Sequence, residues 1–152
     1  MGMFFGRRIH KAVAAGEVVD VSERDGVRSL HLGSQTVQSS MRISAPNDLE
    51  LAYTRSMMGF LLFNPDPVRF LMIGLGGGSL AKFVYHRLPA ARIAAVELNS
   101  QVAAAAHAYF QLPPEDERFE VVIAEGGQYV ADHPDSADVL MVDGFDGVSL
   151  AD

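Results

Sequence analysis

A glycine-rich bend directly after a short apolar run most constrains how this chain can fold. Residues 68–73 are nearly all apolar, which is typical of a parallel strand buried on both faces. Gly74, Gly76 and Gly78 follow at once. Glycines at this point allow a sharp turn into a helix and let a ligand approach the backbone closely. The pattern predicts a strand, a glycine loop and a helix in succession.

Strand and helix patterns then alternate to the end of the chain. The predicted strands are 92–96, 119–124 and 137–142, and the predicted helices are 80–88, 101–110 and 128–132. Strands separated by helices require right-handed crossovers and produce a parallel sheet. We therefore expect a Rossmann-like α/β fold of the S-adenosylmethionine-dependent methyltransferase type. Because such a sheet normally has further strands, we also expect the chain to be truncated at its C-terminus.

The first part of the chain has the pattern of a small β segment. Strand-like stretches occupy 17–21, 27–32 and 35–43. Asp25 and Gly26 form a hairpin signal between the first two stretches, because both residue types tolerate positive φ.

A helical pattern with apolar residues at spacings of three and four follows over residues 49–63, after a break at Pro46. We accordingly divide the chain into an N-terminal β-rich segment, 1–47, and an incomplete Rossmann-like nucleoside-binding domain, 48–152.

Charge and composition exclude several functional classes. The net charge of −7 disfavours nucleic-acid binding and is compatible with a cationic substrate. The absence of cysteine excludes disulfides, cysteine-ligated zinc and thiol catalysis. The five histidines lack metal-ligand spacing, so we expect no metal. No apolar run approaches the length of a membrane span, so we expect no membrane partner. The lack of cysteine fits a cytoplasmic location, which we expect for this chain.

Acidic residues follow the three later strands where each strand ends. They are Glu97, Glu125 and Asp143. Ligands of open parallel sheets bind beyond the carboxyl ends of the strands, so these acids and the glycine loop are expected on one edge. An acid after the second strand can accept both ribose hydroxyl protons, one after the third can meet adenine, and one after the fourth faces the reactive end.

Each signal also has a purely structural interpretation. The glycine loop alone can be a packing turn, and Glu97 can be a solvated strand end. Glu125 can cap the next helix, and Asp143 can be a turn aspartate. Their joint occurrence after successive strands favours a ligand site. Ser79 stands where the dinucleotide fingerprint needs its last glycine, so an adenosyl-sulfonium ligand fits better than a dinucleotide.

From about Tyr53 onward these residues resemble the spermidine synthase (polyamine aminopropyltransferase) family. The matching motifs are Gly74-Leu75-Gly76-Gly77-Gly78-Ser79 for its glycine loop, Val96-Glu97-Leu98-Asn99 for Val-Glu-Ile-Asp, Glu125-Gly126 for Asp-Gly, Asp143-Gly144-Phe145-Asp146-Gly147 for Asp-Ser-Ser-Asp-Pro, and Tyr53-Thr54-Arg55-Ser56 for Tyr-His-Glu-Met. The resemblance implies decarboxylated S-adenosylmethionine as co-substrate, a small-molecule polyamine as acceptor, and a possible homodimer.

The resemblance also implies roles for single residues. Asp143 is the catalytic base, and Tyr53 and Asp146 bind the amine substrate. The ligand-binding residues are Gly74, Gly76, Gly78, Glu97, which holds the ribose, and Glu125 with Gly126 at the adenine region.

Three departures from the family pattern keep alternatives open. Gly77 replaces a loop aspartate, and Thr54 and Arg55 replace a His-Glu pair. A methyltransferase that uses intact S-adenosylmethionine is one alternative, because a carboxylate-bearing ligand favours no acid at position 77. A noncatalytic member with a degenerate site is the other.

Overall fold

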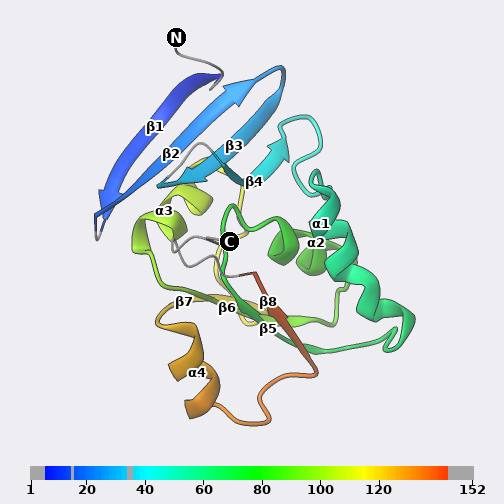
Figure 1. Cartoon of the computed structure of the whole chain (residues 1–152). Helices are drawn as coiled ribbons and strands as arrows, with labels where there is room; N and C mark the ends of the chain where they lie inside the picture. The colour runs from blue at the N-terminus through cyan, green and yellow to red at the C-terminus, as the bar shows by residue number, and fades with distance from the viewer. Residues whose placement is uncertain (1–5, 15, 34–35, 144–152) are drawn as a thin grey trace, which may run out of the picture.

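Two four-stranded sheets make up the framework of the molecule (Figure 1). The structure is a computed structural model, and it describes residues 6–14, 16–33 and 36–143. The first sheet is antiparallel and has the order β1-β2-β3-β4. Its strands are β1 (Arg7–Ala14), β2 (Glu17–Arg24), β3 (Val27–Leu32) and β4 (Val37–Arg42).

The predicted hairpin turn in this sheet is confirmed. Arg24 pairs with Val27, so Asp25 and Gly26 form a two-residue loop, with φ of 52° and 76°. The prediction that β structure begins at residue 17 is wrong, because β1 precedes it. This edge strand is rich in exposed cationic side chains and lacks the apolar alternation that marks a half-buried strand.

The second sheet is parallel and has the order β7-β6-β5-β8. Its elements are β5 (Arg69–Ile73), α2 (Ser79–Arg87), β6 (Arg92–Glu97), α3 (Ser100–Tyr109), β7 (Phe119–Ile123), α4 (Gly126–Asp132) and β8 (Val139–Val142). The chain is therefore a Rossmann-like α/β protein with an antiparallel sheet before its parallel sheet, as the sequence predicts.

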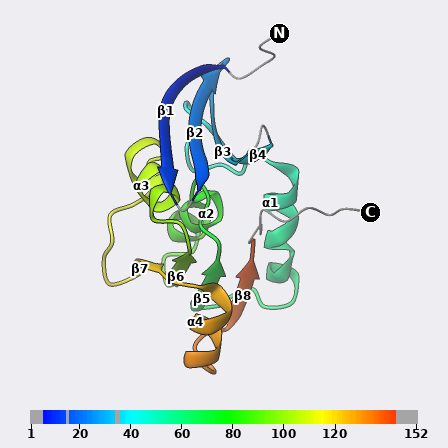
Figure 2. The same cartoon turned by 60° about the vertical axis from the view of Figure 1, so that its left-hand side comes forward.

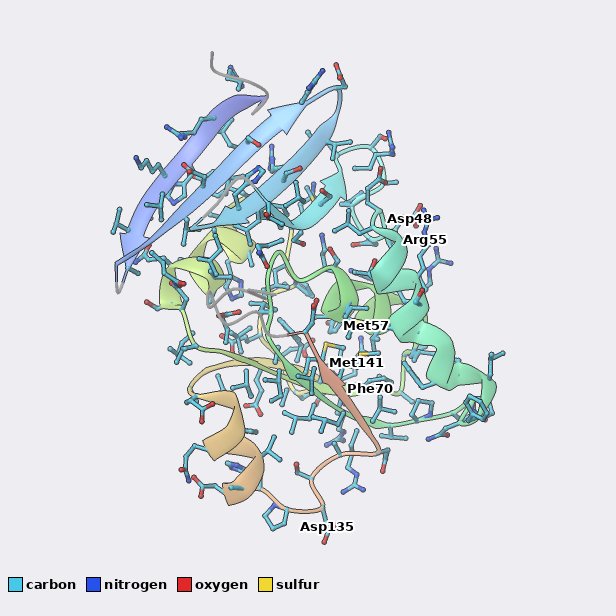
Figure 3. The ribbon with its side chains drawn as sticks, viewed as in Figure 1. Asp48, Arg55, Met57, Phe70, Asp135 and Met141 are labelled. Carbon is cyan, nitrogen blue, oxygen red and sulfur yellow. The ribbon has the colours of Figure 1, made fainter. Side chains whose placement is uncertain are left out.

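The predicted helix at 49–63 is present but shorter and divided. It consists of α1 (Ala52–Met57) and a 3₁₀ helix, η1 (Met58–Leu62). Figure 3 shows Met57 pointing from α1 toward Phe70 of β5 and Met141 of β8. Phe70 and Met141 are buried in the core of the parallel sheet, and full burial of such side chains contributes about 1.5–3 kcal/mol each.

The antiparallel sheet lies over α3, while α4 covers the opposite face of the parallel sheet from α2 and α3 (Figures 1 and 2). A second core joins the antiparallel sheet to α3. Val19, Val21 and Leu30 of the sheet pack there with Val102 and Phe110 from α3 and its end. This packing brings β4 next to the glycine loop, which matters for the site. No helix among the described residues is long and apolar enough to cross a membrane.

Candidate functional site

A hollow of about 430 Å³ lies at the carboxyl ends of the parallel strands. This volume falls in the usual range for small-molecule sites, about 300–1,000 Å³. Six of the residues predicted for the site line it: Gly74, Gly76, Glu97, Glu125, Gly126 and Asp143. They come from the ends of all four parallel strands, so the structure gathers at one place what the sequence separates by up to 69 positions.

The hollow lies where the order of the parallel strands reverses. β5 comes first in the chain and sits between β6 and β8, with which it pairs on either side. From β5 the chain adds β6 and β7 on one side, and it then returns to add β8 on the other side. Such a switch point leaves a crevice beyond the strand ends, and open α/β sheets bind their ligands there.

The glycine loop needs its glycines for conformation. Gly74, Gly76 and Gly78 have φ of 91°, 55° and 76°, values that side-chain-bearing residues rarely adopt. The N–H of Gly74 donates to the carbonyl of Val96 at 2.8 Å, and that of Gly78 donates to Leu75 at 2.9 Å. Gly74 and Gly76 line the hollow, whereas Gly78 caps α2 and faces the side chain of Leu112.

Glu97 ties the end of β6 to the glycine loop. Its Oε2 accepts a hydrogen bond from the N–H of Leu75, and its Oε1 accepts one from the N–H of Asn99, both at 3.0 Å. Asn99 in turn caps α3 through bonds from the N–H groups of Gln101 and Val102. Two fixed backbone donors hold this carboxylate at the rim, with oxygen lone pairs left for further donors.

Glu125 caps α4, which was the structural interpretation of this residue. Its carboxylate accepts hydrogen bonds from the N–H groups of Gly127 at 2.9 Å and Gln128 at 2.6 Å. These two bonds lower the pKa of Glu125 below its ordinary value, since they favour the charged form. The same side chain lines the hollow. Gly126 beside it has no room for a Cβ, which would lie 2.4 Å from Cγ2 of Ile73.

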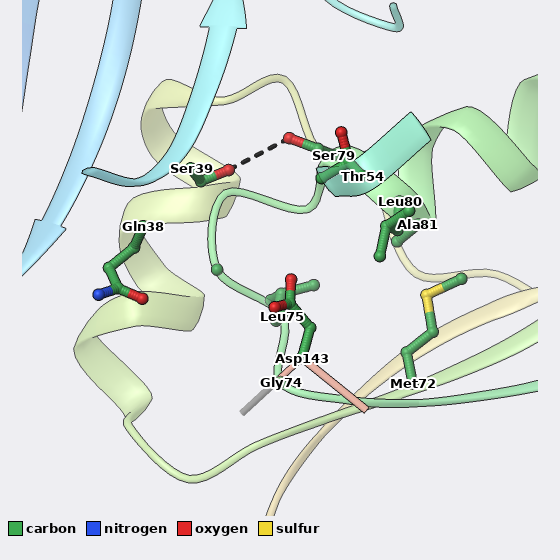
Figure 4. Close-up of a pocket in the computed structure, with 11 residues that line it drawn as sticks. Gln38, Ser39, Thr54, Met72, Gly74, Leu75, Ser79, Leu80, Ala81 and Asp143 are labelled. Carbon is green, nitrogen blue, oxygen red and sulfur yellow. Dashed lines mark hydrogen bonds between the residues drawn. The ribbon is translucent and has the colours of Figure 1, made fainter. Parts of the chain in front are cut away.

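A small side chamber of about 20 Å³ adjoins the hollow beside Asp143 (Figure 4). Asp143, Gln38, Gly74 and Gly76 line both spaces. Three of the residues that line the chamber carry hydroxyl groups. Ser39 and Ser79 are hydrogen bonded at 3.1 Å between their Oγ atoms, and buried Thr54 donates to the carbonyl of Leu51 at 2.6 Å. The chamber has room for about one water-sized group.

The electrostatic character of the two spaces is one-sided. Carboxylates of Glu97, Glu125 and Asp143 line them, and no lysine, arginine or histidine is among the described lining residues. Such a wall favours a cationic or hydrogen-bond-donating ligand. No group of three or more metal-ligating side chains occurs in the part of the chain that the structure describes.

Gly77 packs against protein and does not line the hollow. A Cβ at this position would lie 2.7 Å from Oγ of Ser39 and 2.9 Å from Cδ1 of Phe110. Contacts this short require neighbouring atoms to move. An acidic side chain at position 77 would therefore need both Ser39 and Phe110 to rearrange.

Arg55 and Thr54 lie on different sides of α1. Thr54 lines the chamber, whereas Arg55 is exposed and its Nε donates to the carbonyl of Leu49 at 2.9 Å. Figure 3 shows Arg55 near Asp48 on the outside of the molecule. Arg55 therefore does not place a positive charge in the hollow.

Two of the predicted site residues are not placed. Tyr53 belongs to α1, but its side chain lies outside the described part of the structure, and so does all of Asp146. Sequence reasoning also missed the contribution of the antiparallel sheet. Leu30, Leu32 and Gln38 line the hollow, and Ser39 lines the chamber. Their local pattern indicates only strands, because docking of this sheet on the site is a long-range event.

No family model matches the chain. Curated relatives do. The polyamine aminopropyltransferase of Chromobacterium violaceum is 53% identical over 148 residues, which are 97% of this chain and 57% of that protein. The enzyme of the same name from Neisseria meningitidis serogroup A is 46% identical over 147 residues, 96% of this chain and 56% of that protein. The chain thus spans little more than half the length of these relatives.

Solved structures agree with this similarity. A spermidine synthase in complex with the transition state analogue AdoDATO has a TM-score of 0.75 and 25% identity, and the match covers 95% of this chain and 48% of that one. A shorter similarity reaches a different class. The eEF1A lysine and N-terminal methyltransferase homolog of Drosophila melanogaster is 47% identical over 60 residues, 40% of this chain and 9% of that protein.

Proposed function

This chain is a homologue of the polyamine aminopropyltransferase (spermidine synthase) family, and from that premise we propose that it forms the nucleoside-binding part of an aminopropyltransferase. The donor is decarboxylated S-adenosylmethionine and the acceptor is the amine of a small polyamine. The observation that carries the proposal is the hollow at the strand-order switch, where three carboxylates and no cationic side chain line the described wall. The donor carries a sulfonium and an ammonium, and the acceptor is a polycation, so both match this wall.

The proposed chemistry is a substitution at carbon. The lone pair of the acceptor nitrogen attacks the carbon next to the sulfonium sulfur, and a new C–N bond forms. The C–S bond breaks, its electron pair stays on sulfur, and methylthioadenosine leaves. An amine attacks only after it loses a proton, because an ammonium has no free lone pair. Asp143 lines both the hollow and the chamber, and we assign it as the base that takes this proton.

The remaining residues are assigned to binding. Glu97 is assigned to the ribose hydroxyls, since two backbone donors orient its carboxylate without using all its lone pairs. Glu125 and Gly126 are assigned to the adenine end of the hollow, with Gly74 and Gly76 beneath the ligand. The hydroxyl-lined chamber beside Asp143 suits a single ammonium group, because hydroxyl oxygens and a carboxylate are acceptors. Tyr53 and Asp146 as amine-binding residues, the cytoplasmic location and the homodimer stay predictions from the sequence.

The deciding experiment follows methylthioadenosine release by the purified protein. With decarboxylated S-adenosylmethionine as donor, release is expected to depend on an added diamine. Asp143→Asn is expected to bind the uncharged nucleoside product methylthioadenosine with unchanged affinity and to lose transfer. Full activity in that variant would exclude the base role, and release without any amine would contradict aminopropyl transfer.

Methyl transfer is the second candidate, and one observation favours it. A stretch of 60 residues is 47% identical to the eEF1A lysine and N-terminal methyltransferase homolog of Drosophila melanogaster. Calorimetry with the intact and the decarboxylated ligand separates the candidates. Preference for the intact form, together with production of S-adenosylhomocysteine, would favour methyl transfer.

A further inference from the structure

A lysine is buried behind the glycine loop. Lys82 of α2 is 1% exposed, and its Nζ donates a hydrogen bond to the backbone carbonyl of Phe110 at 2.7 Å. No ion pair to Lys82 occurs among the described residues. Burial lowers the pKa of the Lys82 ammonium to about 8. Burying a cation without a counter-charge costs free energy of folding, and the hydrogen bond to the Phe110 carbonyl offsets part of this cost.

That carbonyl belongs to the segment that backs the glycine loop. Phe110 ends α3 and is fully buried. Its ring lies against Gly77, where a Cβ would come within 2.9 Å of its Cδ1. Leu112 lies in the same way against Gly78, where a Cβ would come within 2.4 Å of its Cδ1. Segment 110–112 is thus the wall on which two loop glycines rest.

Lys82 is also connected to the loop through its own backbone. Its N–H donates to the carbonyl of Gly78 at 2.9 Å in the first turn of α2. Its backbone is therefore bonded to the end of the loop, and its side chain is bonded to the wall behind it. Lys82 therefore connects the glycine loop to segment 110–112, which packs behind the loop.

We propose that Lys82 is a positioning residue for the ligand site, which holds segment 110–112 against the glycine loop and so keeps the loop in the shape that receives an adenosyl group. The effect of Lys82 on the shape of the loop follows from its contacts alone, whereas its effect on adenosyl binding rests on the proposed function. Lys82 does not line the hollow, so it acts through Phe110 and not on the ligand directly.

Hydrogen exchange of the unliganded protein tests the first part. The amides of Leu75 and Gly78 have hydrogen-bond acceptors in Glu97 and Leu75, so loop loosening is measurable at both. Lys82→Met keeps a similar side-chain volume and removes the donor. We expect these two amides to exchange at least tenfold faster in this variant, with no change at the β5 amides that pair with β6.

Val84→Ala is the matched control, because Val84 is fully buried on the same helix and belongs to the core of the parallel sheet. It is expected to lower the unfolding temperature without selective change at Leu75 and Gly78. Unchanged loop exchange in Lys82→Met, or an equal change in Val84→Ala, would overturn the proposal.

Methylthioadenosine affinity tests the second part, through the single variants Lys82→Met and Phe110→Leu and the double variant. Each single change is expected to weaken binding about three- to thirtyfold. The double variant is expected to have the same affinity as the single variant that binds methylthioadenosine less tightly. Multiplication of the two effects would show that Lys82 does not act through Phe110. If the unmodified protein does not bind methylthioadenosine, the proposed function fails, and the exchange data still decide whether Lys82 shapes the loop.

Discussion

The carboxylate of Glu97 is hydrogen bonded to the backbone N–H of Leu75, with 3.0 Å between Oε2 and N. This bond joins the acid after the second parallel strand to the glycine loop after the first. The side chain assigned to the ribose therefore also stabilises the loop beneath the ligand, so a change at Glu97 is expected to affect both.

Replacing Glu97 by alanine is expected to weaken binding of an adenosyl ligand by about 1–3 kcal/mol, since ribose hydroxyls and the Leu75 N–H lose their acceptor. Competition binding with a fluorescent adenosyl analogue measures this change. Glu120→Ala is the control, because Glu120 is exposed on β7 and does not line the hollow. Equal affinity in the Glu97 variant would remove this residue from the site.

Replacing Gly77 by alanine is expected to destabilise the protein by about 1–3 kcal/mol, because the added methyl meets Ser39 and Phe110 at overpacked distances. Urea unfolding measures the free-energy change. Gly59→Ala is the matched control, since a Cβ there would project into open space. An unchanged free energy of unfolding in Gly77→Ala would show that Ser39 and Phe110 do not pack tightly against the loop.

The lowered pKa of Lys82 predicts a dependence of stability on alkaline pH. Below about pH 8 the lysine is protonated in both the folded and the unfolded state, so its contribution is constant. Between about pH 8 and the ordinary value of 10.5, the unfolded state binds more protons, and stability rises with pH. The total rise is roughly 3 kcal/mol at most, from about 1.4 kcal/mol per pKa unit. Unfolding free energies of the unmodified protein minus those of Lys82→Met isolate this effect, and a pH-independent difference would contradict it.

Acid sensitivity is predicted at the opposite end of the sheet. Hydrogen bonds from the Arg69 side chain and backbone lower the pKa of Asp138 to about 2 from 3.8. A depressed folded-state pKa contributes stability above pH 4 that is lost as pH falls toward 2. The stability difference between the unmodified protein and Asp138→Asn is therefore expected to shrink over this interval. A difference that stays constant between pH 4 and pH 2 would show that the ion pair with Arg69 adds nothing.

Much of the fold was predictable because its signals are local. Buried parallel strands leave short apolar runs, and the glycine loop with the acid after each later strand marks their carboxyl ends. The dual position of Glu125, as helix cap and lining residue, was also open to prediction, since Glu125 directly precedes a helix. These features depend on residues that are close in sequence.

The parts that sequence reasoning missed depend on contacts between distant segments. Ser39 meets Ser79 across 40 positions, and Lys82 meets Phe110 across 28. No periodicity within α2 indicates that a lysine is buried there, because segment 110–112 after α3 is what covers it. β1 was missed for another reason: an exposed edge strand needs no apolar face, so its sequence carries little strand signal.

Calorimetric titration of the unmodified protein with two ligands tests whether an adenosyl group binds at the carboxyl ends of the parallel strands. Methylthioadenosine shares the nucleoside of decarboxylated S-adenosylmethionine but lacks its positive charges. We expect saturable one-to-one binding of both ligands, with tighter binding of the cationic one because carboxylates line the hollow. Failure of both ligands to bind, or tighter binding of methylthioadenosine than of decarboxylated S-adenosylmethionine, would contradict an acidic adenosyl site at this end of the sheet.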